Sequence, residues 1–490
     1  MLVQLLLNAA RARPRGPAVR DPFVEMDYGR LTRLAATFRR LILQESSRPH
    51  VGLMLPTTAA GTAAIYGALW ARRAFVPLNF LLQPPEIARI VEDAGLDLVI
   101  ATRHFEPLLA GVPVRTLYLE NLGLRRRYLW SRLCRTPEPP DVDPDDTAAI
   151  LYTSGTSGEP KGVCLTHRNL HGNAVAVIEH LRITPDHRLL GVLPTFHVFG
   201  LNTLVFLPVL LGTSVRCVPR FSPQEACRAV AAGEADLLLA VPSMYAAMAR
   251  LKSIEPRDFR NVFLAVSGGE ALPRQIYDAA RERMGLTLLE GYGLTETSPV
   301  ISVDLPWAHK VGTVGPPLKE VEVRILDALG RPAAPGQDGE LSVRSPFVMK
   351  GYYNRPGQTA AVVDADGWFR TGDIVRQDSD GHLRITGRAR ELIIVGGENV
   401  YPREVEAVLE QHPDVRECAV IGVPAGPRGE EVTAFVSLQE GAAADEIALR
   451  SFCRQRLAGF KVPRRIVIGA DLPRGPTGKI LKRRLPELLS

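Results

Sequence analysis

The chain of 490 residues lacks several features that would assign it to a class at once. Its six cysteines, at positions 134, 164, 217, 227, 418 and 453, form no close pair. The sequence therefore predicts neither a disulfide framework nor a zinc ribbon, and it favours a reducing cytoplasm. The apolar run at residues 2–7 is too short for a secretion signal, and basic residues follow it instead of preceding it. We expect an amphipathic helix there, in a cytoplasmic protein.

Long apolar runs are also missing. The longest, at residues 201–211, contains Asn202, Thr203 and Pro208, and it falls well short of the ~20 residues that cross a bilayer. The sequence therefore predicts no transmembrane helix. A composition that is 46% hydrophobic and 23% charged is that of a folded protein, and the length allows roughly two to four domains.

Acidic residues are scarce at one end of the chain. Residues 450–490 hold eleven basic and two acidic side chains, whereas the whole chain carries a net charge of only +6. Such a tail can meet nucleic acid, a membrane surface or a small polyanion. A second basic segment, residues 125–132, interleaves arginines with Tyr128 and Trp130. It is either a solvated connector or a surface that rests on an anionic membrane.

Strand-like and helical runs alternate through the first 284 residues. Buried strands are predicted at 50–55, 96–101 and 236–241, with helices between them. The pattern predicts an α/β fold with parallel sheets covered by helices. From residue 310 short strands broken by glycine and proline predict a small β-subdomain, and a compact α+β pattern follows a boundary within residues 378–387.

The clearest chemical signal is AILYTSGTSGEPKGVCL at residues 149–165. Glycines let backbone approach phosphate oxygens, hydroxyls donate to them, and lysine supplies a positive charge. It is not a Walker A loop, because no Gly-Lys is followed by Ser or Thr and the loop enters a strand. The segment predicts a polyphosphate-binding loop, which comprises Thr153, Ser154, Gly155, Thr156, Ser157, Gly158 and Lys161.

Six further motifs follow along the chain. They are PTFHVFG at 194–200, SGGE at 267–270, GYGLTETSP at 291–299, TGD at 371–373, GRARELIIVGGENVYPREVE at 387–406 and PTGKI at 476–480. With the phosphate loop, they resemble the adenylate-forming superfamily of acyl-CoA synthetases, carrier-protein adenylation domains and firefly-type luciferases. The resemblance spans essentially the whole chain. It implies an ATP- and acyl-binding N-terminal domain (1–379, with the β-subdomain at 310–379), a hinge (380–387) and a mobile C-terminal lid (388–490).

The resemblance also implies a role for each motif in binding ATP. Tyr292, between Gly291 and Gly293, would stack on adenine, whereas Thr295 and Glu296 would hold ATP and Mg²⁺. One carboxylate together with substrate phosphates is a suitable Mg²⁺ site. The remaining nucleotide contacts would come from an adenine wall at Gly268, Gly269 and Glu270, from Asp373 at the ribose, and from Arg388 at the ribose or a phosphate.

The family pattern also assigns residues to the acid, to CoA and to catalysis. Lys479 would bridge the carboxylate and the α-phosphate in the transition state, and Gly396, Gly397 and Glu398 would line the path of CoA. His197 and Phe199 would gate the acyl pocket, although a lone histidine among apolar residues is more often a core residue. The neighbouring Lys482, Arg483 and Arg484 are expected on a solvated face. Arg390 stands where the family pattern GRxKE has lysine.

The implied reaction is ATP-dependent ligation of a carboxylic acid to CoA through an acyl-adenylate. The motif style favours a medium- or long-chain fatty acid. An aryl acid, or transfer to the phosphopantetheine of an acyl carrier protein, is the alternative within the same chemistry, and a luciferase-like oxygenase or a non-catalytic acyl-binding relative is an alternative outside it. ATP and CoA are polyanions, so the basic tail needs no nucleic acid, and at most peripheral membrane contact is expected.

Overall fold

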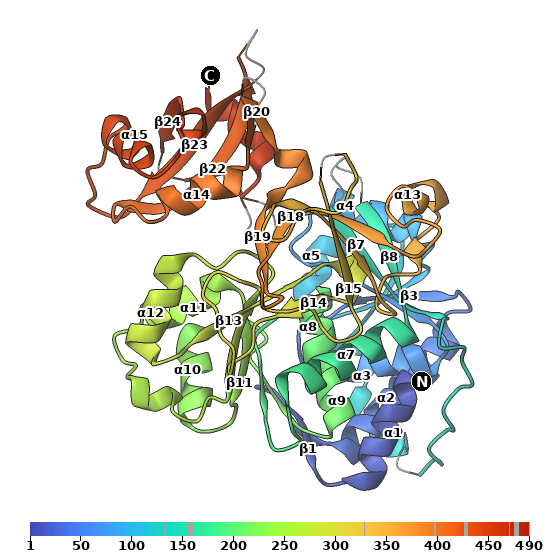
Figure 1. Ribbon diagram of the computed structural model, residues 1–490. Coiled ribbons are helices and arrows are strands. Elements are labelled where there is room, and N and C mark those ends of the chain that lie inside the picture. Colours follow the sequence, from blue (N-terminus) through green and yellow to red (C-terminus); the bar gives the residue numbers. More distant parts are fainter. Residues whose placement is uncertain are drawn as a thin grey trace.

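Two large sheets with helices between them form the body of the molecule, and a smaller lobe follows at the C-terminus (Figure 1). The computed structural model describes residues 1–131, 133–154, 160–327, 329–395, 398–425, 430–469, 471–474 and 480–489. The predicted α/β class, with a large N-terminal part, a β-subdomain and a small C-terminal part, is confirmed.

The first large sheet has eight strands, and its central members are parallel. In spatial order they are β14 (Val300–Val303), β13 (Leu288–Gly293), β12 (Leu264–Gly268), β11 (Leu237–Ala240), β9 (Leu189–Gly191), β10 (Val215–Cys217), β1 (Pro17–Arg20) and β2 (Glu25–Asp27). The strands at the two edges, β14 and β2, run antiparallel to their neighbours. Continuous apolar strands such as Leu237–Ala240 are fully buried, as expected for a sheet covered on both faces.

The second large sheet has seven strands and ends in a hairpin. Their order is β17 (Gly351–Tyr352), β8 (Pro160–Thr166), β7 (Thr147–Ser154), β4 (Ala74–Pro77), β3 (His50–Met54), β5 (Leu98–Ala101) and β6 (Arg115–Tyr118). The β7–β8 hairpin flanks the predicted phosphate loop. The short strand β17 joins β8 antiparallel, and it pairs Tyr352 with Val163.

Helices fill three layers around the two sheets. Their bounds are α1 (Leu2–Ala12), α2 (Tyr28–Glu45), α3 (Ala59–Trp70), α4 (Pro84–Asp93), α5 (Glu106–Leu109), α6 (Leu124–Ser131), α7 (His167–Leu181), α8 (Val198–Leu201), α9 (Leu207–Leu211), α10 (Pro223–Ala231), α11 (Pro242–Ala249), α12 (Arg274–Met284) and α13 (Pro356–Ala360). One core joins α1, α2, α3 and α7 to both sheets, a second packs α10 to α12 on the eight-stranded sheet, and a third packs α4 and α5 on the seven-stranded sheet.

Local sequence explains where α2 and α7 begin and how closely α2 and α3 approach each other. The Asp27 side chain caps α2 by accepting from the backbone N–H of Arg30 at 2.7 Å, and Thr166 and Asn169 form a capping box for α7. Helices α2 and α3 touch at Gly67, where a Cβ would lie 2.5 Å from the Cβ of Phe38. Only glycine permits this approach.

The β-subdomain is a four-stranded antiparallel sheet that leads into the C-terminal lobe (Figure 1). It consists of β15 (Glu322–Leu326), β16 (Gly339–Arg344), β18 (Phe369–Gln377) and β19 (Leu383–Arg388). The turn between β18 and β19 is bound by Lys310, whose ammonium contacts both Asp378 and Asp380. Strand β19 therefore occupies residues 383–388, most of the segment predicted as the hinge.

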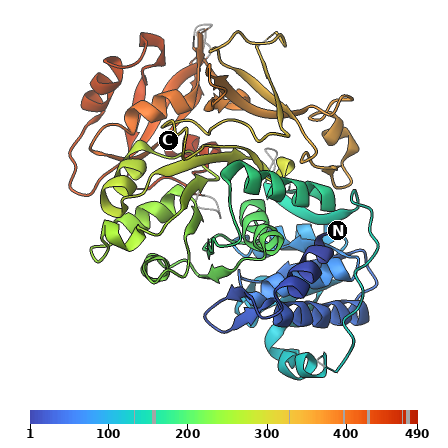
Figure 2. The same cartoon turned by 60° about the horizontal axis from the view of Figure 1, so that its bottom comes forward.

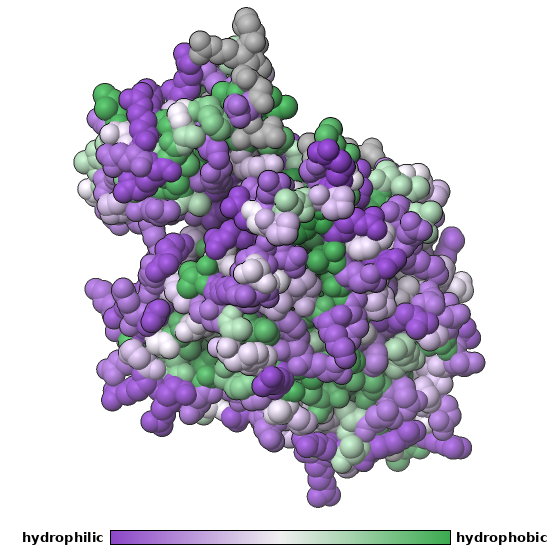
Figure 3. All heavy atoms as spheres, viewed as in Figure 1, coloured by the Kyte–Doolittle hydropathy of each residue, from purple (hydrophilic) through white to green (hydrophobic). Residues whose placement is uncertain are grey.

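The C-terminal lobe has its own core. It contains β20 (Ile393–Val395), β21 (Glu398–Val400), α14 (Pro402–Leu409), β22 (Val415–Pro424), β23 (Glu430–Leu438), α15 (Glu446–Arg454) and β24 (Arg465–Ile468). Figure 2 shows the lobe beside the β-subdomain, and Figure 3 shows a notch on the left between it and the body. The prediction of a solvated face is wrong for Lys482, because its ammonium lies 2.8 Å from both Glu391 and Glu406.

Two further observations bear on the environment of the protein. The six cysteines are unpaired, and five of them are buried. Within the described ranges, no helix is both long enough and apolar enough to cross a bilayer.

Candidate active site

The site is built around the end of β13, where the chain passes through Gly291, Tyr292 and Gly293 into a short 3-10 turn at Thr295–Thr297. Gly293 is required by sterics, because a Cβ there would lie 1.9 Å from the carbonyl oxygen of Pro299. Tyr292 therefore lies at the end of the strand, and Glu296 lies four residues later within the turn. All three sheets contribute to this site, since β13, β8 with β17, and β18 with β19 each supply a side chain.

The first group of side chains joins Tyr292, Asp373 and Arg388. The Tyr292 hydroxyl donates to Asp373 Oδ2 at 2.6 Å, and Arg388 Nε lies 2.8 Å from Asp373 Oδ1. Asp373 and Arg388 are also cross-strand partners on β18 and β19. Burial, together with the Asp373 carboxylate, raises the pKa of Tyr292 far above its ordinary value. The hydroxyl therefore stays protonated and holds a buried carboxylate beside a flat ring.

The second group joins Glu296, Tyr352 and Lys161. The Tyr352 hydroxyl donates to Glu296 Oε1 at 2.9 Å, and Lys161 Nζ lies 5.3 Å from the centroid of the Tyr352 ring. The backbone is fixed as well, because the Met349 N–H donates to the Glu296 carbonyl at 2.8 Å. Tyr352 therefore connects the lysine of the phosphate motif to the carboxylate of GYGLTETSP. Sequence reasoning missed it, and the only signal was its place in the aromatic pair Tyr352-Tyr353.

The phosphate motif is described only at its two flanks. Thr153 on β7 pairs with Lys161 on β8, so both lie at the mouth of the same hairpin. Four of its predicted residues, Gly155, Thr156, Ser157 and Gly158, lie outside the described residues, as does the side chain of Ser154. Lys479, Gly396 and Gly397 also lie outside the described residues.

The predicted adenine wall and the acyl gate adjoin one another. A Cβ on Gly268 would lie 3.2 Å from the Phe199 ring, and Gly269 follows with a φ of +86° that favours glycine. Glu270 is exposed. His197 is exposed too, which makes the core-histidine alternative wrong. Glu398 lies exposed in β21, a strand of the C-terminal lobe.

A half-buried carboxyl group, Glu290, directly precedes the glycine-tyrosine turn. Its pKa is raised to about 7, chiefly by desolvation and in smaller part by Asp304, although the N–H of Leu272 and the charges of Arg403 and Arg384 oppose the rise. Arg403 belongs to α14, so the C-terminal lobe contributes to the field at the site. A direct contact joins the same two parts, because Gln275 Nε2 on α12 donates to the Glu410 carbonyl at 2.7 Å.

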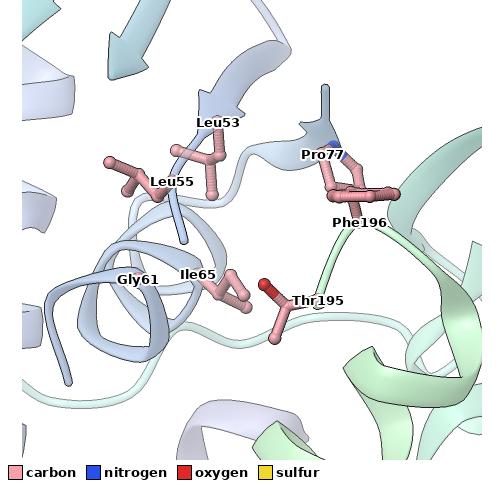
Figure 4. Close-up of a pocket in the computed structure, with 7 residues that line it drawn as sticks. All are labelled: Leu53, Leu55, Gly61, Ile65, Pro77, Thr195 and Phe196. Atoms are coloured by element: carbon pink, nitrogen blue, oxygen red, sulfur yellow. The ribbon is translucent and has the colours of Figure 1, made fainter. Parts of the chain in front are cut away.

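A small apolar cavity lies beside the PTFHVFG segment (Figure 4). It has a volume of about 10 Å³ and is lined by Leu53, Leu55, Gly61, Ile65, Pro77, Thr195 and Phe196. A space of this size holds about one water molecule. It is therefore not an acyl pocket in this arrangement of side chains.

No cluster of three or more histidine, cysteine, aspartate or glutamate side chains that could hold a metal ion is present among the described residues. Glu296 offers a fixed, hard oxygen donor, because the Tyr352 hydroxyl holds its carboxylate beside Lys161 of the phosphate hairpin. Mg²⁺ commonly binds through one or two carboxylates plus substrate phosphates. The donor chemistry therefore fits Mg²⁺ that arrives with ATP, and it does not fit an ion held by protein ligands alone.

Known proteins match the chain over nearly its whole length. It is 36% identical to a feruloyl-CoA synthase from Amycolatopsis sp over 485 residues (97% of this chain, 96% of the relative). It is 39% identical to a long-chain-fatty-acid–CoA ligase from Bacillus subtilis (strain 168) over 496 residues (93% and 88%). The crystal structure of ATP-bound MatB from Rhodopseudomonas palustris superposes with a TM-score of 0.91 at 29% identity, and covers 100% and 99% of the two chains.

Family models match both parts of the chain. The model described as "AMP-binding enzyme" matches residues 7–353, and the one described as "AMP-binding enzyme C-terminal domain" matches residues 404–479. The first match covers more than half of the chain and includes Tyr292 and the group of Glu296, Tyr352 and Lys161, whereas Asp373 and Arg388 lie outside it. The second match lies within the C-terminal lobe. The chain therefore belongs to the AMP-binding enzyme family, also known as the adenylate-forming superfamily.

Proposed function

We propose that the protein ligates a medium- or long-chain fatty acid to CoA, with ATP as the energy source and AMP and pyrophosphate as by-products. Acid–thiol ligation is the activity for which the relatives are named. The observation that supports the proposal most directly is the pair of contacts on one turn, Tyr292 to Asp373 and Glu296 to Tyr352. Together they bring a flat ring, a buried carboxylate and a second, partly buried carboxylate to one turn, and this combination supports a nucleotide site there.

In the first half-reaction the acid carboxylate attacks the α-phosphorus of ATP and pyrophosphate leaves. The Tyr292 ring stacks on adenine and Asp373 accepts the ribose hydroxyls, a role that suits a carboxylate already fixed by two donors. Lys161 and the loop 153–158 hold the phosphates. Mg²⁺, when it is bound at Glu296, neutralises phosphate charge. No general base is needed, because the attacking carboxylate is ionised at neutral pH.

In the second half-reaction the CoA thiol attacks the acyl carbon and AMP leaves. Lys479 serves the first half-reaction, and the loop Gly396-Gly397-Glu398 serves the second, so the C-terminal lobe presents a different face to each. The β18–β19 ladder restrains residues up to Arg388. We place the pivot just after it, at residues 389–392, where the chain leaves the four-stranded sheet as a 3-10 turn.

The fatty acid is favoured by the apolar character of the gate and by the relative with 39% identity. Phe199 packs on Gly268, and the segment that follows, Asn202–Phe206, is buried. The feruloyl-CoA synthase has an aryl acid in its name, so an aryl acid is the second candidate. An acyl carrier protein is the alternative thiol acceptor. The unpaired cysteines favour a reducing cytoplasm as the site of action.

The test is pyrophosphate release across a panel of acids with hydroxylamine as the trap. Octanoate, palmitate, ferulate and an amino acid are each supplied with ATP and Mg²⁺, with and without CoA. The proposal expects ATP-dependent hydroxamate from the fatty acids, and acyl-CoA when the thiol is present. Hydroxamate from ferulate alone would replace the fatty acid with an aryl acid. Adenylate that CoA does not discharge would favour a carrier protein.

A matched pair of variants tests the nucleotide site. Asp373→Asn removes the charge that Tyr292 and Arg388 hold, and it should raise the KM for ATP. Asp338→Asn removes a carboxylate that pairs with Arg376 on the same β-subdomain at 2.9 Å, and it should leave that KM unchanged. Equal effects of the two substitutions would contradict the placement of ribose at Asp373.

A further inference from the structure

Helix α6 carries apolar side chains on its outer as well as its inner face. Its inner residues Leu124 and Tyr128 pack against the N-terminal core. On the outer side Leu129 and Trp130 are 50% and 59% exposed, and Leu133, just past the helix, is 86% exposed. An exposed helix face is ordinarily polar. Leu129, Trp130 and Leu133 therefore form an exposed apolar surface, and its removal from water would lower the free energy.

Arginines surround this apolar face. Arg125, Arg126 and Arg127 are all exposed, and the segment 121–135 contains five arginines and no acidic residue. We define the α6 patch as Arg125, Arg126, Arg127, Leu129, Trp130 and Leu133. A surface that binds a partner with an anionic exterior and an apolar interior needs both the arginines and the apolar side chains.

The α6 patch is held in place before any partner arrives. The Arg40 guanidinium of α2 lies 4.9 Å from the centroid of the Trp130 ring, and it also donates to Cys134 Sγ at 3.3 Å. The Ser131 hydroxyl donates to the Tyr128 carbonyl at 2.6 Å. A fixed ring loses less conformational freedom on binding than a mobile one.

We propose that the α6 patch rests on the surface of an anionic lipid bilayer. Tryptophan favours the boundary between headgroups and acyl chains, and leucines enter the apolar layer beneath. Arginines keep their charge among the headgroups while their stems remain apolar, and anionic lipid supplies the complementary charge. The helix lies at the end of the molecule farthest from the C-terminal lobe, where it is the cyan helix at the bottom of Figure 2. Membrane contact there leaves the lobe free to move.

The test is flotation of the full chain with lipid vesicles. Vesicles of phosphatidylcholine alone are compared with vesicles of phosphatidylcholine mixed with phosphatidylglycerol, at low and at high ionic strength. The proposal expects binding to the mixed vesicles that high salt weakens. Replacing Arg125, Arg126 and Arg127 together with glutamine should lower the partition constant about 100-fold at low salt, from about fivefold for each arginine.

A second variant isolates the apolar component and has a matched control. W130Q/L133Q removes the exposed tryptophan and leucine, and it should lower binding at least about tenfold. W307Q/I447Q removes a tryptophan that is 48% exposed and an isoleucine that is 76% exposed elsewhere. Trp307 also carries an arginine over its ring, Arg182 at 4.1 Å. This control should bind as the unaltered chain does.

Four results would overturn the proposal. They are the absence of binding to mixed vesicles, equal binding to the two lipid compositions, equal loss in W307Q/I447Q, and a solution dimer that W130Q/L133Q converts to a monomer. The last would assign the α6 patch to a second copy of the chain. Circular dichroism melting of each variant shows whether it is folded, and the readout requires no enzymatic activity, so it stands independently of the proposed reaction.

Discussion

Tyr352→Phe is the substitution that tests the geometry of the site most directly. It removes one hydroxyl, which donates to Glu296 Oε1 at 2.9 Å, and it keeps the ring that lies 5.3 Å from Lys161 Nζ. A hydrogen bond to a charged group contributes about 1.5–3 kcal/mol. Because Glu296 and Tyr352 are only partly buried, we take the lower end, which corresponds to roughly tenfold in rate.

The assay is pyrophosphate release at several Mg²⁺ concentrations with the best acid of the panel. Loss of the hydroxyl frees the Glu296 carboxylate to rotate, so kcat should fall about tenfold and the Mg²⁺ requirement should rise. Tyr353→Phe is the matched control, because the neighbouring ring packs edge-on against His50 with centroids 5.2 Å apart. It should leave both parameters as they are in the unaltered enzyme.

An unchanged kcat and an unchanged Mg²⁺ requirement in Tyr352→Phe would refute the role of the hydroxyl at Glu296. A fall in kcat that Tyr353→Phe reproduces would be equally damaging, because it would reflect a general disturbance of the aromatic pair. A melting temperature close to that of the unaltered enzyme is expected for both variants, since each substitution keeps the ring that packs against the core.

Three further predictions concern Glu290 in β13, the contact between α12 and the C-terminal lobe, and Lys479 in that lobe. Glu290 has a pKa raised to about 7 in the folded state, so the folded protein keeps a proton that the unfolded chain loses as pH rises from about 4.5 to about 7. The free energy of unfolding therefore falls across that window by up to about 3 kcal/mol. The melting temperature of Glu290→Gln should rise relative to that of the unaltered protein across the same window, and a constant difference would contradict the raised pKa. Gln275→Ala removes the donor to the Glu410 carbonyl; with about 1 kcal/mol lost, the population of this lobe arrangement should fall about fivefold in a fluorescence energy-transfer assay, and an unaltered distance distribution would count against it. Lys479→Ala should slow adenylate formation by about 10²–10³-fold, while thioester formation from preformed acyl-AMP continues. Equal loss of both half-reactions would contradict the assignment of a separate face of the lobe to each half-reaction.

Individual elements were predictable where their pattern was local. The strand predicted at 50–55 is β3 (His50–Met54), and the strand predicted at 236–241 contains β11 (Leu237–Ala240). A continuous apolar run suffices to predict such segments. The strand β1 (Pro17–Arg20) was not predicted, because its parallel partner β10 lies about 200 residues away in the chain.

Side-chain environments were predictable only in part. The basic tail predicted a solvated Lys482, but Glu391 and Glu406 converge on its ammonium and outweigh the cost of partial burial. The histidine of PTFHVFG is surrounded by apolar residues in sequence, yet its side chain is exposed. Neither outcome follows from nearest neighbours in the chain, because both depend on how separate segments pack.

The sequence by itself determined the family and the set of chemical groups, because each motif is a short local run whose glycines, hydroxyls and charges can be recognised without the fold. Only the tertiary structure decided which of those groups act together. Tyr292 is hydrogen-bonded to Asp373, which lies 81 residues away in the chain, and Glu296 is hydrogen-bonded to Tyr352, which lies 56 residues away. The same holds for the α6 patch, whose apolar outer face is evident only once its inner face is seen to pack on the core. Contacts between segments far apart in the chain arise from sheet edges and helix faces that converge in space, and no local pattern encodes that convergence.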